Sequence, residues 1–213
     1  MRLYTYPAAP SPRRIHLFLA EKGLEVEQVI VDLRDGEQLK PEFASVNPAL
    51  TVPALVLDDG TCLCESVAIC DYLESIKPEP PLLGATPGER AMVLERNHWV
   101  EQNGLLAVME GFRNRSRAMA DHALTGPRPV PQIPALAERG IQRYGWFLED
   151  LDGLLRDSEF IAGARFSMAD ITALVTIDFA SWGIRQAVPK DFTALQRWRT
   201  QVSERPAILA LGP

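Results

Sequence analysis

Apolar and polar residues recur with two different periods along the first third of the chain. Val26–Leu33 places apolar side chains at alternating positions, and Arg2–Tyr6 is rich in aromatic and β-branched residues, so both segments are predicted to be β-strands. Between them, His16–Lys22 has helical spacing and ends at Gly23, a residue that favours the left-handed conformation of a helix terminus. Right-handed crossover geometry makes the two strands parallel.

The next segment predicts an antiparallel hairpin followed by a helix. Pro53–Leu57 and Thr61–Cys64 flank the turn sequence Asp58-Asp59-Gly60, which is typical of a connection between two strands. From residue 65 to residue 76 the apolar positions recur at helical spacing, so this helix is expected to pack on the sheet. The predicted order is β-α-β followed by β-β-α, with a mixed sheet.

A proline-rich segment marks the predicted domain boundary. Residues 77–87 contain four prolines and cannot continue a helix. We therefore expect a first domain over residues 1–77, a linker over 78–87 and an all-helical domain over 88–213.

The pattern of the second domain predicts four helices separated by loops. They are expected at residues 88–121, 135–156, 168–182 and 192–203. Ser167 and Asp170 have the spacing of a capping box at the start of the third of these helices. Residues 125–134 carry four prolines and are predicted to form a loop.

Ser11 is the one hydroxyl in the turn that precedes the first predicted helix. Pro12 suits the first helical position, because it has no N–H to leave unpaired, and this places Ser11 at the N-cap. The same residue then lies where the first strand ends and the positive end of a helix begins. Such a position is suited to an anion.

Composition and charge narrow the choice of partner. Twenty-two basic and 28 acidic residues give a formal net charge of -6, which lacks the electrostatic footprint of a nucleic-acid-binding protein. No apolar run approaches the roughly 20 residues of a membrane span, and no secretory signal is recognisable at the N-terminus. We expect a cytoplasmic protein that binds a small molecule, with neither nucleic acid nor membrane as a partner.

The cysteines and histidines do not predict a metal site. Cys62, Cys64 and Cys70 form an odd, clustered set, which argues against a disulfide framework, so reduced thiols that pack as small apolar side chains are expected. Cys62 and Cys64 alternate on a predicted strand, so their side chains should face opposite ways and should not chelate one ion together. No His/Cys spacing matches a zinc site.

Three short sequences, in this order and at these distances, carry a family resemblance: Asn47-Pro48, Thr51-Val52-Pro53 and Glu65-Ser66. With the order of predicted elements, they make the whole chain similar to the glutathione transferase superfamily, and nearest to its bacterial beta, nu and theta-like classes. The resemblance implies an α+β thioredoxin-like N-terminal domain, an all-α C-terminal domain and a homodimer. It also implies glutathione as cosubstrate, with no metal, and detoxification chemistry on a small, hydrophobic electrophile.

The resemblance also implies roles for residues that would hold glutathione. In the family, the Val52–Pro53 bond is cis, and the main chain at Val52 pairs with the cysteinyl backbone as an added strand would. The Ser66 hydroxyl and nearby helix amides take the γ-glutamyl carboxylate, and Glu65 accepts from the ammonium group. Gln38 and Lys40 lie where a bacterial branch contacts the glycine end. The alternatives are an ordinary helix start for residues 65–66 and solvated loop residues for 38 and 40.

The residue that activates the glutathione thiol is predicted to be Ser11, with Tyr6 as a rival. Ser11 coincides with the cysteine of the beta class and with the asparagine of a bacterial class that handles glutathione disulfide. Ala9 and Pro10 stand where phi-like and theta-like relatives carry a serine. Other classes use a tyrosine at the end of the first strand, which keeps Tyr6 open, whereas strand packing is the preferred interpretation of Tyr4.

The second substrate is expected on the first long helix of the helical domain. The family resemblance points to Asn103, Met109, Phe112 and Arg113, although a methionine or an aromatic residue on a long helix is more often core. Conjugation of glutathione to an electrophile is the leading function. A glutathione-dependent disulfide or peroxide reductase and a non-catalytic binding or regulatory protein are the alternatives.

Overall fold

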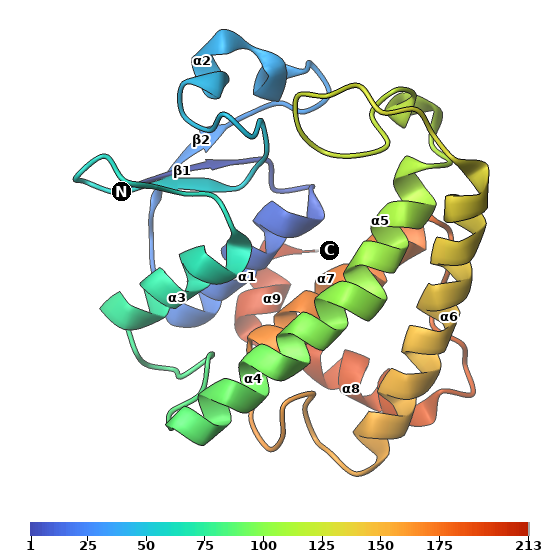
Figure 1. Ribbon diagram of the computed structural model, residues 1–213. Helices are drawn as coiled ribbons and strands as arrows, with labels where there is room; N and C mark the ends of the chain where they lie inside the picture. The colour runs from blue at the N-terminus through green and yellow to red at the C-terminus, as the bar shows by residue number, and fades with distance from the viewer. Residues whose placement is uncertain (213) are drawn as a thin grey trace. The chain divides into compact units, whose positions relative to one another are not determined.

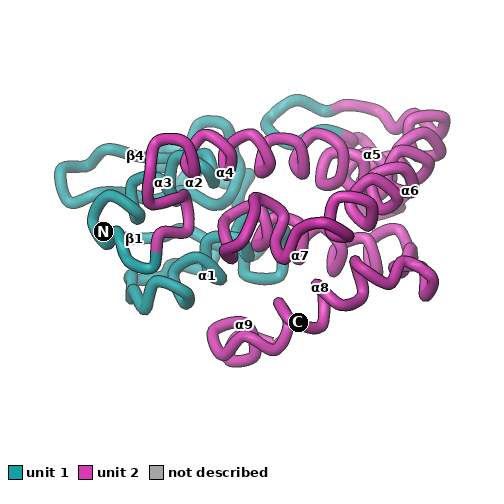
Figure 2. The backbone as a smooth tube through the Cα atoms, turned by 90° about the horizontal axis from the view of Figure 1, so that it is seen from below, with its two compact units in different colours: residues 1–80, 124–129 teal, residues 81–123, 130–213 magenta. Residues whose placement is uncertain are grey.

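The computed structural model describes residues 1–212, which form two compact units. Unit 1 comprises residues 1–80 and 124–129, and unit 2 comprises residues 81–123 and the described residues from 130 onwards (Figure 2). The thioredoxin-like character of unit 1 and the helical character of unit 2 agree with the fold class predicted from the sequence.

Unit 1 is built around a four-stranded mixed sheet with the strand order β2-β1-β3-β4 (Figure 1). Its strands are β1 (Arg2–Thr5), β2 (Glu27–Ile30), β3 (Ala54–Val56) and β4 (Cys62–Leu63). The β1 strand pairs in parallel with β2 and antiparallel with β3, and β3 pairs antiparallel with β4. The predicted crossover and hairpin are therefore confirmed, with shorter strands than the pattern indicated.

The helices of unit 1 pack on this sheet through apolar side chains. They are α1 (Pro10–Lys22), the 3-10 turn η1 (Glu37–Leu39), α2 (Pro41–Ala44) and α3 (Ser66–Ile76). The α1 helix ends at Gly23, whose φ of 57° and ψ of 43° are left-handed, as predicted. The core includes Leu3, Ile15 and Ile69, which are almost completely buried.

A buried ion pair joins α1 to α3. Lys22 Nζ, in the last turn of α1, lies 2.5 Å from Glu74 Oε2 on α3, and both side chains are buried. Lys22 Nζ also donates a hydrogen bond of 3.0 Å to the carbonyl of Pro78 and another to that of Pro80. These contacts hold α3 and the segment that follows it against the end of α1.

Unit 2 consists of helices. They are α4 (Pro87–Val100), the π-helical turn η2 (Glu101–Leu105), α5 (Leu106–Arg113), the 3-10 turn η3 (Arg117–Met119), α6 (Pro134–Arg156), α7 (Met168–Gly183), α8 (Thr193–Ser203) and α9 (Pro206–Leu211). The α7 helix is buried along most of its length and contacts α4, α5 and α8. The short α9 helix was not predicted from the sequence.

The helix predicted over residues 88–121 ends earlier than expected. It is interrupted by the π-helical turn and stops at Arg113, after which the chain turns. Two amide side chains satisfy main-chain groups at this end: Asn114 Nδ2 donates to the Glu110 carbonyl at 3.1 Å, and Gln132 Nε2 donates to the Arg113 carbonyl at 2.6 Å. The termination therefore depends partly on Gln132, a residue distant in sequence.

The capping box predicted at the start of α7 is present. Asp170 Oδ2 accepts hydrogen bonds from the amide and the hydroxyl of Ser167, at 2.9 and 3.0 Å. Asp170 Oδ1 accepts from Ile161 N at 3.0 Å and from Trp198 Nε1 at 2.8 Å. Burial raises the pKa of Asp170 to about 6, and the hydrogen bonds to its carboxylate oppose that rise. This carboxylate anchors α7 to α8.

The Lys22–Glu74 pair yields a stability prediction. The K22M variant is expected to lose about 3 to 5 kcal/mol of unfolding free energy, because the buried Glu74 carboxylate loses the charge of Lys22. Urea unfolding followed by circular dichroism measures the change. The double variant K22M/E74L should recover most of the loss.

Lys77 offers a matched control, because its Nζ donates to the Gly23 carbonyl at 3.1 Å in an exposed position. The K77M variant should lose less than about 1 kcal/mol. Equal losses for K22M and K77M would contradict the importance assigned to the buried pair.

Candidate functional site

Ser11 lies inside α1, and the prediction that it caps this helix is wrong. The helix begins at Pro10 with Ala9 at the N-cap, and within the described chain no side chain caps it. The Ala9 carbonyl accepts the first helical hydrogen bond, from Arg13 N at 3.0 Å. Pro10 suits the first helical position as well as Pro12 would, so the helix starts one residue before Ser11.

Ser11 supplies the free main-chain N–H of the first turn of α1, because prolines stand on both sides of it. Pro10 and Pro12 have no N–H, and the Ala9 N–H donates to the Tyr6 carbonyl at 2.9 Å. Across residues 1–212, no hydrogen bond engages the Ser11 amide or its hydroxyl, and the residue is half-buried. Ser11 therefore presents an N–H and an O–H together at the positive end of α1.

The start of α3 lies beside the start of α1. Ser66 is the first residue of α3, Glu65 is its N-cap, and the first helical hydrogen bond runs from Ile69 N to the Glu65 carbonyl at 2.9 Å. The amides of residues 66–68 thus have no intrahelical acceptor. Ser66 Oγ is buried and lies 3.5 Å from the Ser11 carbonyl oxygen, at the outer limit of a hydrogen bond. The two helices run side by side (Figure 1).

Asn47 holds the loop that leads to Val52. The buried Asn47 side chain donates through Nδ2 to the Thr51 carbonyl at 2.8 Å and to Thr51 Oγ1 at 3.1 Å. Its Oδ1 accepts from Ala49 N at 3.0 Å. Sequence reasoning did not assign this function, although an asparagine that bonds the main chain two residues ahead is a common way to stabilise a turn.

The main chain at Val52 is available for pairing. The Val52–Pro53 peptide bond is cis, and β3 begins at Ala54, which pairs with Tyr4 of β1. In the part of the chain that the structure covers, no hydrogen bond engages the amide or carbonyl of the half-buried Val52. Both groups can therefore bond to an extended peptide laid along this segment.

Gln38 and Lys40 differ in how the structure uses them. Gln38 Oε1, on η1, is buried and has no hydrogen-bond partner among the described residues. A buried acceptor without a donor costs free energy, which a ligand that donates a hydrogen bond would recover. Lys40 is exposed, and its Nζ lies 3.6 Å from Glu37 Oε1 in a solvated pair. The geometry thus favours Gln38 over Lys40 as a ligand contact.

Tyr6 is positioned as a rival to Ser11, whereas Tyr4 is not. Tyr6 follows β1 and is half-buried, and no described residue forms a hydrogen bond with its hydroxyl. Tyr4 packs against Phe43 with ring centroids 6.1 Å apart, in agreement with its predicted packing role. The Nε2 atom of His16 forms a hydrogen bond of 2.8 Å with Thr5 Oγ1, and burial lowers the pKa of His16.

Two of the predicted substrate residues are engaged within unit 2. Asn103 Nδ2 donates to the Trp99 carbonyl at 2.9 Å, and Arg113 donates to the His122 carbonyl at 2.6 Å. Burial lowers the pKa of Arg113. These bonds serve the helix and the loop that follows it, so they give Asn103 and Arg113 a structural function. Met109 is half-buried on α5.

Phe112 belongs to an aromatic cluster, which we define as Phe112, Phe179 and Trp182. The ring centroids of Phe112 and Phe179 are 5.4 Å apart, and Trp182 lies 5.5 Å from Phe112 and 4.9 Å from Phe179. Trp182 is 56% exposed, so the cluster reaches the surface of unit 2. Sequence reasoning missed Phe179 and Trp182, because their place beside Phe112 depends on the packing of α7 against α5.

Cys62 and Cys64 do not face opposite ways, and that prediction is wrong. Their Sγ atoms lie 3.6 Å apart. The alternation rule applies only within a strand, and β4 ends at Leu63, so Cys64 lies beyond it. The residues from 1 to 212 contain no group of three or more His, Cys, Asp or Glu side chains placed to hold a metal ion.

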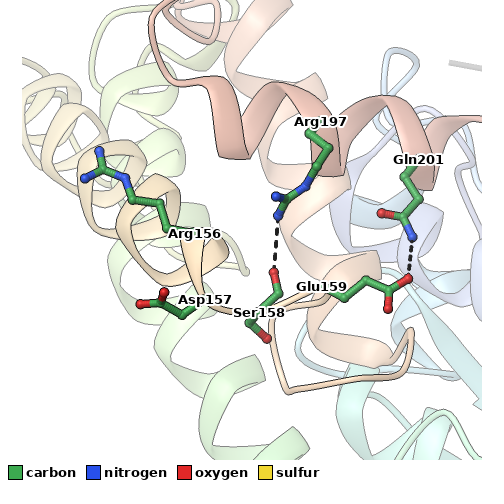
Figure 3. Close-up of a pocket in the computed structure, with 6 residues that line it drawn as sticks. All are labelled: Arg156, Asp157, Ser158, Glu159, Arg197 and Gln201. Carbon is green, nitrogen blue, oxygen red and sulfur yellow. Dashed lines mark hydrogen bonds between the residues drawn. The ribbon is translucent and has the colours of Figure 1, made fainter.

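An open polar pocket of about 430 Å³ lies at the end of α6 beside α8 (Figure 3). It is lined by Arg156, Asp157, Ser158, Glu159, Arg197 and Gln201. Its groups largely satisfy one another: Arg197 donates to the Ser158 carbonyl at 3.3 Å, and Gln201 donates to Glu159 at 2.8 Å. No feature of this pocket calls for a ligand. Over the described residues, no helix has the length and apolar character needed to cross a membrane.

The chain matches two family models. Residues 9–76 match the model described as "Glutathione S-transferase, N-terminal domain", and residues 138–210 match "Glutathione S-transferase, C-terminal domain". Among curated proteins, the chain is 34% identical to "Glutathione S-transferase 2" of Saccharomyces cerevisiae, over 99% of this chain and 89% of that protein.

Solved structures give the same family. A glutathione S-transferase domain-containing protein of Marinobacter aquaeolei is 34% identical, with a TM-score of 0.90 over 98% of this chain and 100% of that chain. Gtt2 of Saccharomyces cerevisiae is 33% identical, with a TM-score of 0.90 over 100% of both chains.

Proposed function

This chain belongs to the glutathione transferase superfamily, and from that premise we propose that it ionises the glutathione thiol for attack on a small, hydrophobic electrophile. The observation that carries this proposal is the juxtaposition of the α1 and α3 starts, where Ser66 Oγ lies 3.5 Å from the Ser11 carbonyl oxygen. Two helix N-termini that carry free donors form an environment for two anionic groups, a carboxylate and a thiolate.

Glutathione is proposed to lie along the edge of unit 1. Its γ-glutamyl carboxylate accepts from the Ser66 hydroxyl and the first amides of α3, and the exposed Glu65 carboxylate accepts from its ammonium group. The Val52 main chain pairs with the cysteinyl residue. Gln38 Oε1 accepts from an N–H near the glycine end, and this bond satisfies the orphaned oxygen. Lys40 contributes at most a solvated charge.

Ser11 is the proposed thiol-activating residue. A thiol with a pKa near 8.5 is mostly protonated at neutral pH, and a fall of two units requires about 2.7 kcal/mol. A hydrogen bond to the thiolate contributes about 1.5 to 3 kcal/mol, and a helix N-terminus contributes up to about 1 kcal/mol. The Ser11 hydroxyl supplies the first of these contributions and its amide the second.

The aromatic cluster is proposed to receive the electrophile on unit 2. Trp182 offers an exposed ring held by Phe112 and Phe179, and aromatic surfaces bind flat, apolar molecules through stacking. In the proposed reaction, the glutathione thiolate forms a bond to the electrophilic carbon, and the leaving group departs with the electron pair of the bond that breaks. Of the residues predicted for this surface, the proposal keeps Phe112, and it adds Trp182.

A homodimer is also proposed, because the family is typically dimeric. Exposed apolar side chains such as Met92 and Leu106 supply surface that an association would bury. The predicted cytoplasmic location stays a prediction.

The roles of Ser11 and Ser66 are separable by variants. S11A should raise the pKa of bound glutathione by about 1 to 2 units, because it removes the hydroxyl and leaves the amide. S66A should weaken glutathione binding and leave that pKa unchanged. Ultraviolet absorbance of the bound thiolate, followed against pH at saturating glutathione, gives the pKa, and calorimetry gives the affinity.

Two controls accompany these variants. S75A removes an exposed α3 hydroxyl that donates to the Asp71 carbonyl at 2.9 Å, and it should change neither quantity. Y6F tests the rival hydroxyl. A thiol pKa that moves in Y6F and stays constant in S11A would transfer the activating role to Tyr6.

The Gln38 side chain is expected to lower the stability of the fold and to strengthen glutathione binding. Q38L removes a buried acceptor that has no donor among the described residues, so the urea midpoint should stay constant or rise. Glutathione affinity should fall about 2- to 10-fold, the value of one neutral hydrogen bond. The neighbouring variant K40M should change affinity less. If Q38L unfolds more easily and binds glutathione normally, the side chain is structural.

The Trp182 side chain is expected to contribute to binding of the electrophile and not to binding of glutathione. W182A is expected to raise the KM for an aryl halide about 2- to 10-fold through lost stacking, with an unchanged dissociation constant for glutathione. Trp146 on α6 is 53% exposed, nearly as much as Trp182, so W146A is a matched control. Indistinguishable kinetics for W182A and W146A would remove the aromatic cluster from the substrate surface.

A further inference from the structure

The thiol pair formed by Cys62 and Cys64 has no function in the proposed reaction. Their Sγ atoms are 3.6 Å apart, within sulfur hydrogen-bond range, and both residues are half-buried. Cys62 lies on β4, the last strand in the sheet order, and Cys64 lies beyond the end of that strand. Reagents can therefore reach the pair from the sheet edge, whereas Cys70 is 0% exposed.

The surroundings of Cys64 disfavour its thiolate form. Burial raises the pKa of Cys64 to about 11, and the neighbouring Cys62 sulfur and the negative charge of Glu65 add to this effect. Cys64 is therefore a protonated thiol at neutral pH, and its S–H can donate to the Cys62 sulfur. Only a thiolate attacks a disulfide, and the separation of 3.6 Å lets the second sulfur of the pair attack whichever sulfur has reacted first.

We propose that Cys62 and Cys64 are a redox-active dithiol that glutathione disulfide converts to an intramolecular disulfide. The thiolate of one cysteine of the pair attacks one sulfur of glutathione disulfide, which breaks its S–S bond, forms a mixed disulfide and releases one glutathione thiolate. The other cysteine then loses its proton to solvent and attacks the protein sulfur of the mixed disulfide, which releases the second glutathione. Two protein thiols lose two electrons and two protons, and one glutathione disulfide becomes two glutathione thiols.

The distance between the sulfurs makes ring closure accessible. A disulfide requires an S–S distance of about 2.0 Å, so the sulfurs must approach by about 1.5 Å from their separation of 3.6 Å. Closure constrains residues 62–64, which lead directly into Glu65 and Ser66 at the start of α3. Oxidation should therefore weaken binding at α3. This last consequence rests on the proposed glutathione site, whereas the oxidation itself does not.

Intact-mass analysis of the full chain tests the oxidation. Reduced protein is incubated with glutathione disulfide, quenched in acid, unfolded and alkylated. The expected product has lost two hydrogens and takes up one alkyl group, on Cys70. The C70S variant should form the same disulfide and take up no alkyl group. Wild-type protein that keeps all its thiols, or that stops as a stable mixed disulfide, would overturn the proposal.

Single variants test whether the second step needs both sulfurs. C64S and C62S should each stop at the mixed disulfide, because the second sulfur is missing. Loss of two hydrogens in either variant would refute the assignment of the disulfide to this pair. Circular dichroism of each variant establishes that it is folded, and the wild-type mass result needs no variant.

The effect on binding is measured with S-methylglutathione, which has no free thiol and cannot reduce the protein disulfide. The oxidised wild-type protein should bind it more weakly than the reduced protein, and chemical reduction should restore the affinity. The S66A variant should still form the disulfide. If S66A binds S-methylglutathione as well as the wild-type protein does, the proposed α3 site fails while the dithiol proposal stands. Equal affinities of the oxidised and reduced forms would refute the coupling.

Discussion

The buried ion pair between Lys22 and Glu74 is the interaction on which the candidate site depends. It joins the ends of α1 and α3, whose starts meet at Ser11 and Ser66, so the two helices run side by side in the same direction. Parallel helix dipoles repel each other, because like partial charges are brought together at both ends. At the negative ends, Lys22 Nζ pairs with Glu74 and donates to the carbonyls of Pro78 and Pro80, so it joins the two helices there. At the opposite ends the positive partial charges remain, and an anion there stabilises the pair of helices.

Much of the fold was predictable because its signals are local. The strand alternation, the hairpin turn and Gly23 each act within a few residues, and all appear in the structure. The errors have equally definite causes. Two prolines, each acceptable in a first helical turn, left the start of α1 uncertain by two residues. The end of α5 depends on Gln132, whose proximity in space no helical period reveals.

The sequence names candidate residues for the site, and the structure adds how buried and how hydrogen-bonded each of them is. The family motifs locate Val52 and Ser66, but only the structure shows that Gln38 has a buried oxygen without a partner among the described residues. Likewise, Phe112 was a plausible candidate from its helix, whereas its association with Trp182 requires α5 and α7 to pack together. Hydrogen-bond satisfaction and exposure are properties of the folded surroundings, so spacing alone cannot supply them.

The shortness of β4 connects the thiol pair to the proposed glutathione site. The strand ends at Leu63, the chain bends at Glu65 before α3 begins, and the sulfurs of Cys62 and Cys64 lie 3.6 Å apart just ahead of this turn. In the proposed scheme, the same turn orients the first amides of α3 toward the glutathione carboxylate. Two equilibria that share one segment are linked reciprocally: if oxidation weakens binding by a given factor, bound ligand disfavours oxidation by the same factor. A high ratio of reduced glutathione to glutathione disulfide then keeps the dithiol reduced in two ways. It does so by mass action on the protein disulfide and by occupancy of the neighbouring glutathione site.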